Sequence, residues 1–152
     1  MEDFSDVIDL QALTAWMTEQ GLGSNPIENA GLLEGGTQNF LLKFTRDGRD
    51  YVLRRPPRHL RKNSNSTMLR EARVLEALAG SNVPHPGFIA GCSDESVLGA
   101  CFYLLEPIDG FNAANGLPDY HASDPAIRHR MGLAISLVSL RLRPPTQIRF
   151  LF

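Results

Sequence analysis

An Asp-Gly pair between two apolar runs constrains this chain more than any other feature. In "KFTRDGRDYVLRRPP", Asp47 and Gly48 separate two runs of strand-favouring residues. Glycine supplies the positive φ that a tight turn requires, so this stretch predicts a β-hairpin. Another glycine-bearing turn, in "IENAGLLEGGTQNFLLKF", adds a strand on the N-terminal side. The sequence therefore predicts three consecutive antiparallel strands, at about residues 27–33, 39–45 and 50–55.

Helical periodicity places one helix before these strands and one after them. Apolar residues at helical spacing in "DLQALTAWMTEQGLG" predict a helix over about residues 8–20, with Asp9 as its N-cap and Gly21 as its left-handed end. "STMLREARVLEALAG" predicts a second helix, with Ser66 or Thr67 as its cap. The polar, proline-bearing stretch "PPRHLRKNSNS" is a loop that leads into this second helix.

Two more short strands complete the predicted organisation. They lie near residues 88–92 and 101–106 and are joined by a polar turn. The result is an α+β fold, a five-stranded antiparallel sheet with one inserted helix. After the fifth strand the chain is loop-like until another helix in "AIRHRMGLAISLVSL". We divide the chain into an N-terminal helix (1–24), a central lobe (25–110) and a connector with a further helix (111–152).

Composition excludes several classes of protein. The 152 residues are 43% hydrophobic and 21% charged, which is typical of a globular domain. The net charge of −2 gives no basic field that would attract nucleic acid or anionic lipid. Cys92 and Cys101 have no metal-binding spacing, so we expect two buried reduced thiols and no zinc site. Neither a signal peptide nor a membrane-spanning run is found, and a cytoplasmic location is expected.

Five motifs stand in an order that resembles a known family. They are "GGTQNF", "YVLRRPP", "REARVLEAL", "VPHP" and "FYLLEPIDG", and they cover about residues 25–110. This order resembles the N-terminal lobe of protein kinases. It is most similar to the aminoglycoside/choline phosphotransferase family, in the subfamily related to the kinase-like domain found beside acyl-CoA dehydrogenases. The resemblance implies a kinase-like N-lobe with an incomplete start of the helical C-lobe, and ATP-dependent phosphorylation of a small-molecule hydroxyl.

On this resemblance, the glycine turn and the third strand bind the nucleotide phosphates. Gly35, Gly36 and Thr37 would bring backbone N–H groups to phosphate oxygens, although a glycine pair also fits a plain hairpin turn. Val52 and Arg54 share a face because strand side chains alternate. Val52 would lie under the adenine, and Arg54, in place of the usual kinase lysine, would bind the α- and β-phosphates. An ordinary surface residue at a strand end is the alternative for Arg54.

Glu71 on the second predicted helix is the expected partner of Arg54. In kinases a helix glutamate holds the strand-three cation in place, and a carboxylate one turn into this helix could reach the sheet. An exposed helix charge near the N-terminal turn, where acidic residues are favourable, is the alternative. The neighbouring Arg55 would point to the other face of the sheet, as a solvated surface arginine.

"YLLEPIDG" would supply the hinge that binds the adenine edge. By resemblance, Leu105 lies at the back of the adenine pocket. Glu106 would accept a hydrogen bond at its backbone carbonyl, and Ile108 would donate one from its backbone N–H. Because these are main-chain roles, a strand that runs into an ordinary turn would have the same sequence.

The resemblance also implies residues that the sequence does not contain. The family uses a catalytic-loop aspartate in a His-Gly-Asp-like string, followed by an asparagine, and a second aspartate that holds magnesium. Neither string is found, and the family pattern is lost between about residues 134 and 141. We therefore expect a truncated or frame-disrupted member that has the ATP-binding lobe, has no catalytic or magnesium-binding residue of its own, and is inactive alone.

Two functions of other classes stay open. Residues 54–62, "RRPPRHLRK", are locally basic and could contact nucleic acid phosphates, but no aromatic residues interleave with the cations. A non-catalytic module that binds a partner or a second copy, through the exposed lobe face and the C-terminal "FLF", is the other alternative. The expected partners are a nucleotide and, in the full-length family, a small-molecule hydroxyl acceptor; neither nucleic acid nor a membrane is expected.

Overall fold

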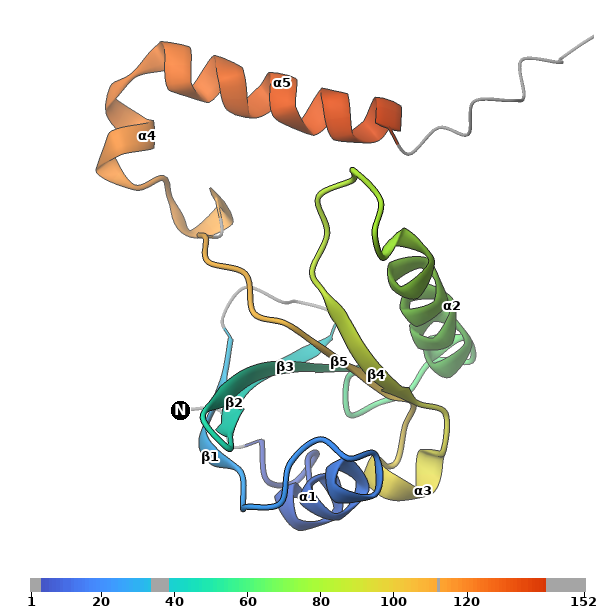
Figure 1. Ribbon diagram of the computed structural model, residues 1–152. Helices are drawn as coiled ribbons and strands as arrows, with labels where there is room; N and C mark the ends of the chain where they lie inside the picture. Colours follow the sequence, from blue (N-terminus) through green and yellow to red (C-terminus); the bar gives the residue numbers. More distant parts are fainter. Residues whose placement is uncertain (1–3, 34–38, 112, 142–152) are drawn as a thin grey trace, which may run out of the picture. The chain divides into compact units, whose positions relative to one another are not determined.

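A five-stranded antiparallel sheet organises the first part of the chain (Figure 1). The computed structural model describes residues 4–33, 39–111 and 113–141. The strands lie in the order β1-β2-β3-β5-β4, each antiparallel to its neighbours. Their bounds are Glu28–Leu32 (β1), Phe40–Arg46 (β2), Arg49–Arg55 (β3), Phe88–Cys92 (β4) and Phe102–Leu105 (β5). The predicted α+β fold with five antiparallel strands is confirmed.

The turn between β2 and β3 has the conformation that its sequence predicts. Arg46 and Arg49 face each other at the end of the ladder, so the loop holds only Asp47 and Gly48. Both loop residues have positive φ, 49° and 75° respectively. Such a turn matches the twist of the flanking strands, and it fixes which residues of β2 and β3 lie opposite each other. The other predicted turn, which includes Gly35, lies outside the described residues.

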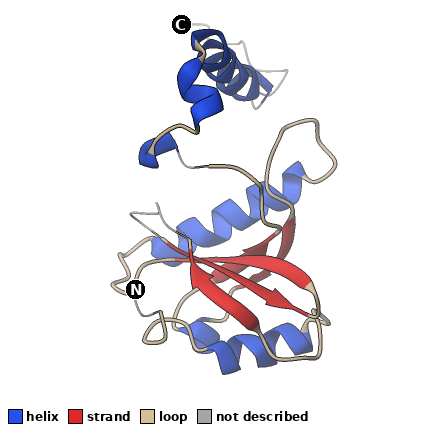
Figure 2. Cartoon of the chain, turned by 90° about the vertical axis from the view of Figure 1, so that its left-hand side faces the viewer, coloured by secondary structure: helices blue, strands red, loops and turns tan. Residues whose placement is uncertain are grey.

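Helices cover both faces of the sheet (Figure 2). On one face lie α1 (Leu10–Glu19) and the short α3 (Glu95–Leu98), and on the other lies α2 (Ser64–Leu78). The predicted cap of α1 is confirmed, since the Asp9 carboxylate accepts hydrogen bonds from the first-turn N–H groups at 2.8 and 3.1 Å. The loop between β4 and β5 was predicted as a plain polar turn, but it contains α3.

The predicted cap of α2 is wrong. This helix begins at Ser64 with Asn63 as the N-cap, so Ser66 and Thr67 lie inside it. The Asn63 side chain makes no capping hydrogen bond, and the Ser66 hydroxyl instead donates to the Asn63 carbonyl at 3.0 Å. Five successive cap-forming residues, 63–67, precede the apolar part of the helix. Composition alone therefore does not select the first helical position.

Each face of the sheet has its own apolar core. The core under α1 and α3 is the larger one, and in it the rings of Trp16 and Phe102 meet edge to face with centroids 4.8 Å apart. The core under α2 contains the buried residues Val52, Met68, Ala72, Cys101, Tyr103 and Leu105. Both cysteines are buried free thiols, as the sequence predicted. The residues of β3 therefore alternate between two different cores.

The second compact unit comprises Gly80–His85 and the chain from Gly110 onward. Its described elements are η1 (Ala113–Asn115), α4 (Asp119–Ser123) and α5 (Pro125–Arg141), and α5 is the helix predicted from the sequence. No helix in the described ranges is long and apolar enough to cross a membrane. The C-terminal "FLF", on which the interaction-module alternative rests, lies outside the described residues.

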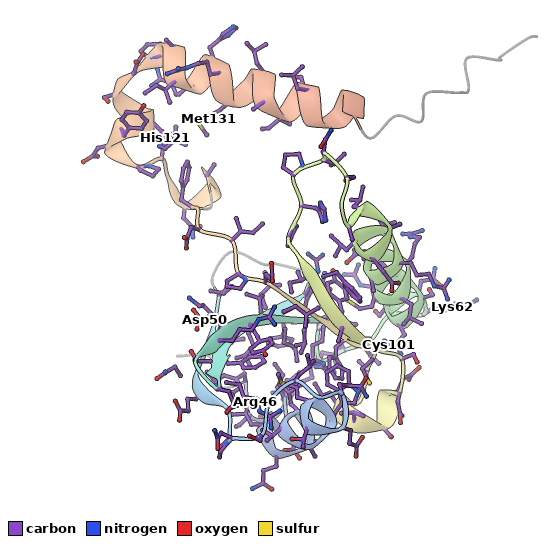
Figure 3. All side chains as sticks on the ribbon, viewed as in Figure 1. Arg46, Asp50, Lys62, Cys101, His121 and Met131 are labelled. Atoms are coloured by element: carbon purple, nitrogen blue, oxygen red, sulfur yellow. The ribbon has the colours of Figure 1, made fainter. Side chains whose placement is uncertain are left out.

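Two arginines are buried on the α1 face of the sheet, but only one has a full set of hydrogen bonds. Arg46, labelled in Figure 3, is 1% exposed. Its Nε donates to the carbonyl of Asn25 at 2.7 Å, and its Nη1 donates to the carbonyl of Thr14 at 3.1 Å. Its Nη2 donates to the hydroxyl of Thr18 at 2.7 Å. This arginine therefore ties β2 to α1 and to the loop that precedes β1.

Arg55 does point away from Arg54, but it is not the solvated surface residue that was predicted. Its side chain is on the α1 face and the residue is 4% exposed. Its Nη2 donates to the carbonyl of Leu98, the last residue of α3, at 3.1 Å. Its Nε and Nη1 have no hydrogen-bond partner among the described residues. Burial lowers the pKa of Arg55 because the charged form loses its hydration.

The two buried arginines should differ sharply when each is replaced by methionine, which is apolar and of similar length. We expect Arg46→Met to lower the free energy of unfolding by about 2–4 kcal/mol, because it removes three charge-assisted hydrogen bonds that tie β2 to α1 and to the loop before β1. We expect Arg55→Met to change it by less than about 1 kcal/mol or to raise it, because a poorly compensated buried charge is removed. Urea denaturation followed by the fluorescence of Trp16, the single tryptophan, measures both changes. Equal losses for the two variants would contradict this interpretation.

Candidate functional site

The candidate site is built around an ion pair between the sheet and α2. Arg54, near the end of β3, and Glu71, in α2, approach to 3.3 Å between Nη2 and Oε2. Their side chains are 32% and 33% exposed, so the pair is half-buried at the edge of the smaller core. The sequence paired these residues through the kinase-like pattern, and the fold brings them into contact. The role of the pair in binding a nucleotide stays a prediction.

A tyrosine that the sequence analysis did not select completes this cluster. The Tyr103 hydroxyl donates to Glu71 Oε2, the oxygen that also contacts Arg54, at 3.0 Å. Tyr103 is 2% exposed, and it lies directly opposite Arg54 in the β3–β5 ladder. Burial raises the pKa of Tyr103, so its hydroxyl keeps its proton. The sequence could have indicated Tyr103, because it lies two residues before Leu105. Strand side chains alternate, so both residues face the same side of the sheet.

The predicted floor of the adenine pocket is apolar and shared between two strands. Val52 and Leu105 lie directly opposite each other in the β3–β5 ladder, and each is 7% exposed. On the other side of β3, Leu41 lies opposite Arg54 and Lys43 lies opposite Val52. These β2 residues were also missed, although the two-residue turn at the hairpin end fixes their register with β3.

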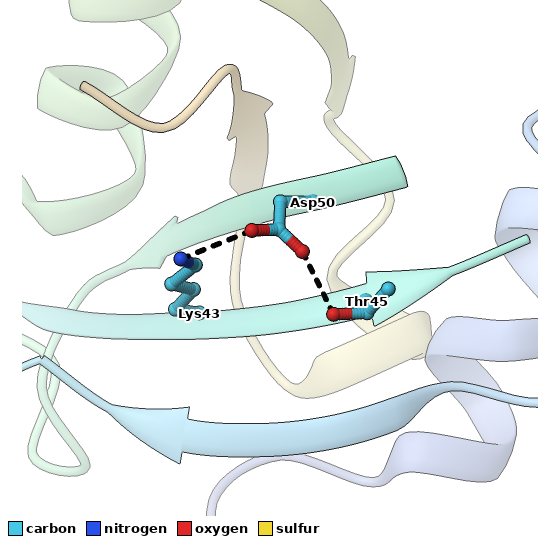
Figure 4. Close-up of polar contacts among 3 residues, drawn as sticks. All are labelled: Lys43, Thr45 and Asp50. Atoms are coloured by element: carbon cyan, nitrogen blue, oxygen red, sulfur yellow. Dashed lines mark hydrogen bonds and ion pairs between the residues drawn. The ribbon is translucent and has the colours of Figure 1, made fainter. Parts of the chain in front are cut away.

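A polar cluster borders this face at the turn end of the hairpin (Figure 4). The Asp50 carboxylate pairs with the Lys43 ammonium at 3.0 Å and accepts a hydrogen bond from the Thr45 hydroxyl at 2.8 Å. The Thr45 hydroxyl, followed by Lys43, lowers the pKa of Asp50 because both stabilise the carboxylate. Lys43 is thus paired with a carboxylate of the neighbouring strand, at the end of the hairpin away from Arg54.

The hinge segment is fixed by both its backbone and its side chains. The Glu106 N–H donates to the Gly87 carbonyl at 2.8 Å, and the Glu106 carboxylate pairs with Arg49 at 2.9 Å. A Cβ at Gly87 would lie only 2.8 Å from Glu106 Cδ, so glycine permits this close approach. Ile108 is 65% exposed. The main-chain contacts expected of Glu106 and Ile108 with adenine stay predictions.

A basic pocket opens beside the ion pair. Its volume is about 840 Å³, and both Arg54 and Glu71 line it. From there it extends along the β3–α2 loop, past Arg58, His59 and Arg61, to the first turn of α2. Arg58 forms an ion pair with Asp6, with 3.0 Å between Nη2 and Oδ2. The lining thus includes three arginines, Arg54 among them, and one carboxylate, Glu71, so it carries a net positive charge.

Three of the predicted phosphate-binding residues, Gly35, Gly36 and Thr37, lie outside the described residues. Their contribution to the site stays a prediction. Over the described part of the chain, no three His, Cys, Asp or Glu side chains gather in a way that could hold a metal ion. What the described residues supply is one half-buried cation held by a carboxylate, an apolar floor and a basic pocket.

Comparison with known proteins identifies the family. The sequence matches the phosphotransferase enzyme family, APH, over residues 31–149, and the chain belongs to this family. It is similar in structure to a crystal structure from Ralstonia eutropha JMP134 that is described as an aminoglycoside phosphotransferase. The TM-score is 0.56 and the sequence identity 35%, over 68% of this chain and 29% of the other. The sheet and its helices are therefore a protein-kinase-like N-lobe.

Two curated relatives are acyl-CoA dehydrogenase family members. The chain is 32% identical to member 10 from Mus musculus over 94 residues, which are 62% of this chain and 9% of that protein. It is 31% identical to member 11 from Gallus gallus over 121 residues, which are 75% of this chain and 15% of that protein. The chain thus spans less than a third of the length of each protein that it matches, including the crystal structure.

The ion-pair cluster should contribute measurably to stability. Glu71→Ala leaves the buried Tyr103 hydroxyl without its acceptor, and we expect it to lower the free energy of unfolding by about 1–2 kcal/mol. Glu76→Ala is the matched control, because Glu76 is exposed on the same helix; it should change stability by less than about 0.5 kcal/mol. Urea denaturation measures both. A Glu71→Ala variant as stable as Glu76→Ala would show that the cluster is not formed in solution.

Proposed function

We propose that this chain binds ATP as the nucleotide-binding lobe of a phosphotransferase whose acceptor is a small-molecule hydroxyl. The observation that carries the proposal is the contact between Arg54 and Glu71 beside a basic pocket and on the same face as Val52 and Leu105. A cation, a carboxylate that orients it and an apolar floor are the elements that hold a nucleotide in a kinase-like N-lobe. Membership of the phosphotransferase family supports the same function.

Each group in the cluster would have a separate task in nucleotide binding. Arg54 would place its guanidinium against two phosphate oxygens, since a planar fork suits bidentate contacts. Glu71 would orient that guanidinium and limit its rotation. Val52 and Leu105 would exclude water from one face of the adenine. The bound ATP would supply the phosphoryl group, and the acceptor and the remaining catalytic groups would come from outside the described lobe.

Phosphoryl transfer by this chain alone is not part of the proposal. The sequence contains neither the His-Gly-Asp-like string nor the second aspartate that the resemblance implies. We expect the purified chain to release no ADP from Mg-ATP above a protein-free blank, measured with a coupled assay in the presence and absence of simple alcohols and amino alcohols. Sustained turnover that is lost in Arg54→Ala would overturn this expectation.

Nucleic acid binding is less well supported by the contacts of the basic stretch. Of its four arginines, Arg54 contacts Glu71, Arg55 is buried beside α3, and Arg58 pairs with Asp6. Of its five cations, this leaves Arg61 and Lys62, both exposed. A surface that binds a phosphate backbone needs several cations that face solvent together. These contacts favour a structured loop beside a pocket over a nucleic acid interface.

Calorimetry tests the proposed nucleotide binding directly. We expect the chain to bind Mg-ATP, and Arg54→Ala to weaken the affinity by about tenfold or more, because a charge-assisted contact with phosphate is lost. Arg73→Ala is the matched control: Arg73 is an exposed arginine of α2 that does not line the pocket, and its loss should change affinity less than twofold. A folded wild-type chain that does not bind Mg-ATP, or equal losses in the two variants, would refute the proposal.

A further inference from the structure

We infer that Tyr103 is a positioning residue of the nucleotide site, whose hydroxyl fixes the Glu71 carboxylate in the orientation that presents Arg54 to phosphate. This inference rests on the proposed nucleotide binding. It assigns a task to a residue of β5 that the kinase-like pattern in the sequence did not select. Tyr103 would act through Glu71, without touching the nucleotide itself.

The Arg54–Glu71 contact needs a third group to hold it in one geometry. Both side chains are long and about one third exposed, and their Nη2–Oε2 distance is 3.3 Å. An ion pair of this kind loses side-chain entropy when it forms and is screened by water, so alone it contributes little to holding the two side chains in place. A pair that flexible would not by itself hold a guanidinium ready for a ligand.

Tyr103 supplies a rigid reference point. It is 2% exposed, and its ring lies 6.4 Å from that of Phe88, centroid to centroid, within the α2-facing core. Its backbone lies directly opposite that of Arg54 in the β3–β5 ladder. The hydroxyl therefore projects from a fixed position on the same sheet as Arg54. The 3.0 Å bond from this hydroxyl to Glu71 Oε2 ties the helix carboxylate to the strand that carries its partner.

The chemistry of the tyrosine hydroxyl suits this task. It is a neutral donor, and burial raises the pKa of Tyr103, so it stays neutral and protonated at physiological pH. A neutral donor orients the carboxylate without adding a second cation that would compete with Arg54 for it. The positive charge of Arg54 therefore stays beside the Glu71 carboxylate, and an incoming phosphate would meet a guanidinium of defined orientation.

The test is Tyr103→Phe, which keeps the buried ring and removes only the oxygen. We expect Tyr103→Phe to weaken Mg-ATP affinity by about threefold to tenfold in calorimetry, the effect of losing one hydrogen bond that organises the site. Tyr51→Phe is the matched control, because Tyr51 is 4% exposed in the other core of the same sheet; it should leave affinity unchanged. If Tyr103→Phe does not fold, Tyr103→Met, which also lacks the hydroxyl, takes its place.

A double-mutant cycle separates positioning from a general effect on the core. In a Glu71→Ala background, Tyr103→Phe should change affinity less than twofold, because the hydroxyl no longer has a carboxylate to position. An equal loss in both backgrounds would show a merely structural role and overturn the inference. Wild-type affinity of Tyr103→Phe, with binding still lost in Arg54→Ala, would overturn the inference and leave the proposed function standing. A folded wild-type chain without affinity for Mg-ATP would instead refute the proposed function, and the inference with it.

Discussion

The register of the β2–β3 hairpin is the constraint on which the rest of the lobe depends. Asp47 and Gly48 close the ladder in two residues of positive φ, and this fixes the pairing of every later residue of β3. The Asp47 carboxylate also accepts the backbone N–H of Ser24 at 2.7 Å and the side-chain N–H of Asn25 at 2.5 Å. The turn thus anchors the segment that enters β1, and with it the order of the first three strands.

This register also decides which side chains can form the candidate site. Arg54 reaches the α2 face because it is two residues from Val52 and directly opposite Tyr103. The ion pair between Arg54 and Glu71 is weak when considered alone. The strand and the helix that carry the two residues, however, pack against each other through the core under α2. The pairing of the strands therefore determines where Arg54 and Glu71 lie, and their own attraction contributes little until the strands are paired.

Sequence reasoning identified the features that depend on neighbours in the chain. The hairpin turn, the five strands and the Asp9 cap each follow from local residue types, and each is confirmed. It was wrong where tertiary contacts decide the outcome. Arg55 is buried because α3, a helix that the sequence did not reveal, covers its face and offers the Leu98 carbonyl. Tyr103 was missed because the acceptor of its hydroxyl, Glu71, is 32 residues away in the chain.

The two consecutive arginines at the end of β3 affect which register this strand can adopt. A shift of one residue that brought Arg55 to the position of Arg54 would move Arg54 into the position of Leu53, which is 0% exposed in the core under α1 and α3. The opposite shift would put Leu53 in the position of Arg54, so that no cation of β3 faced Glu71 there. Either shift is therefore penalised within the strand itself, and the arginine pair acts together with the two-residue turn to select a single register. An insertion or deletion in the turn should accordingly destabilise the lobe and not produce a second stable pairing.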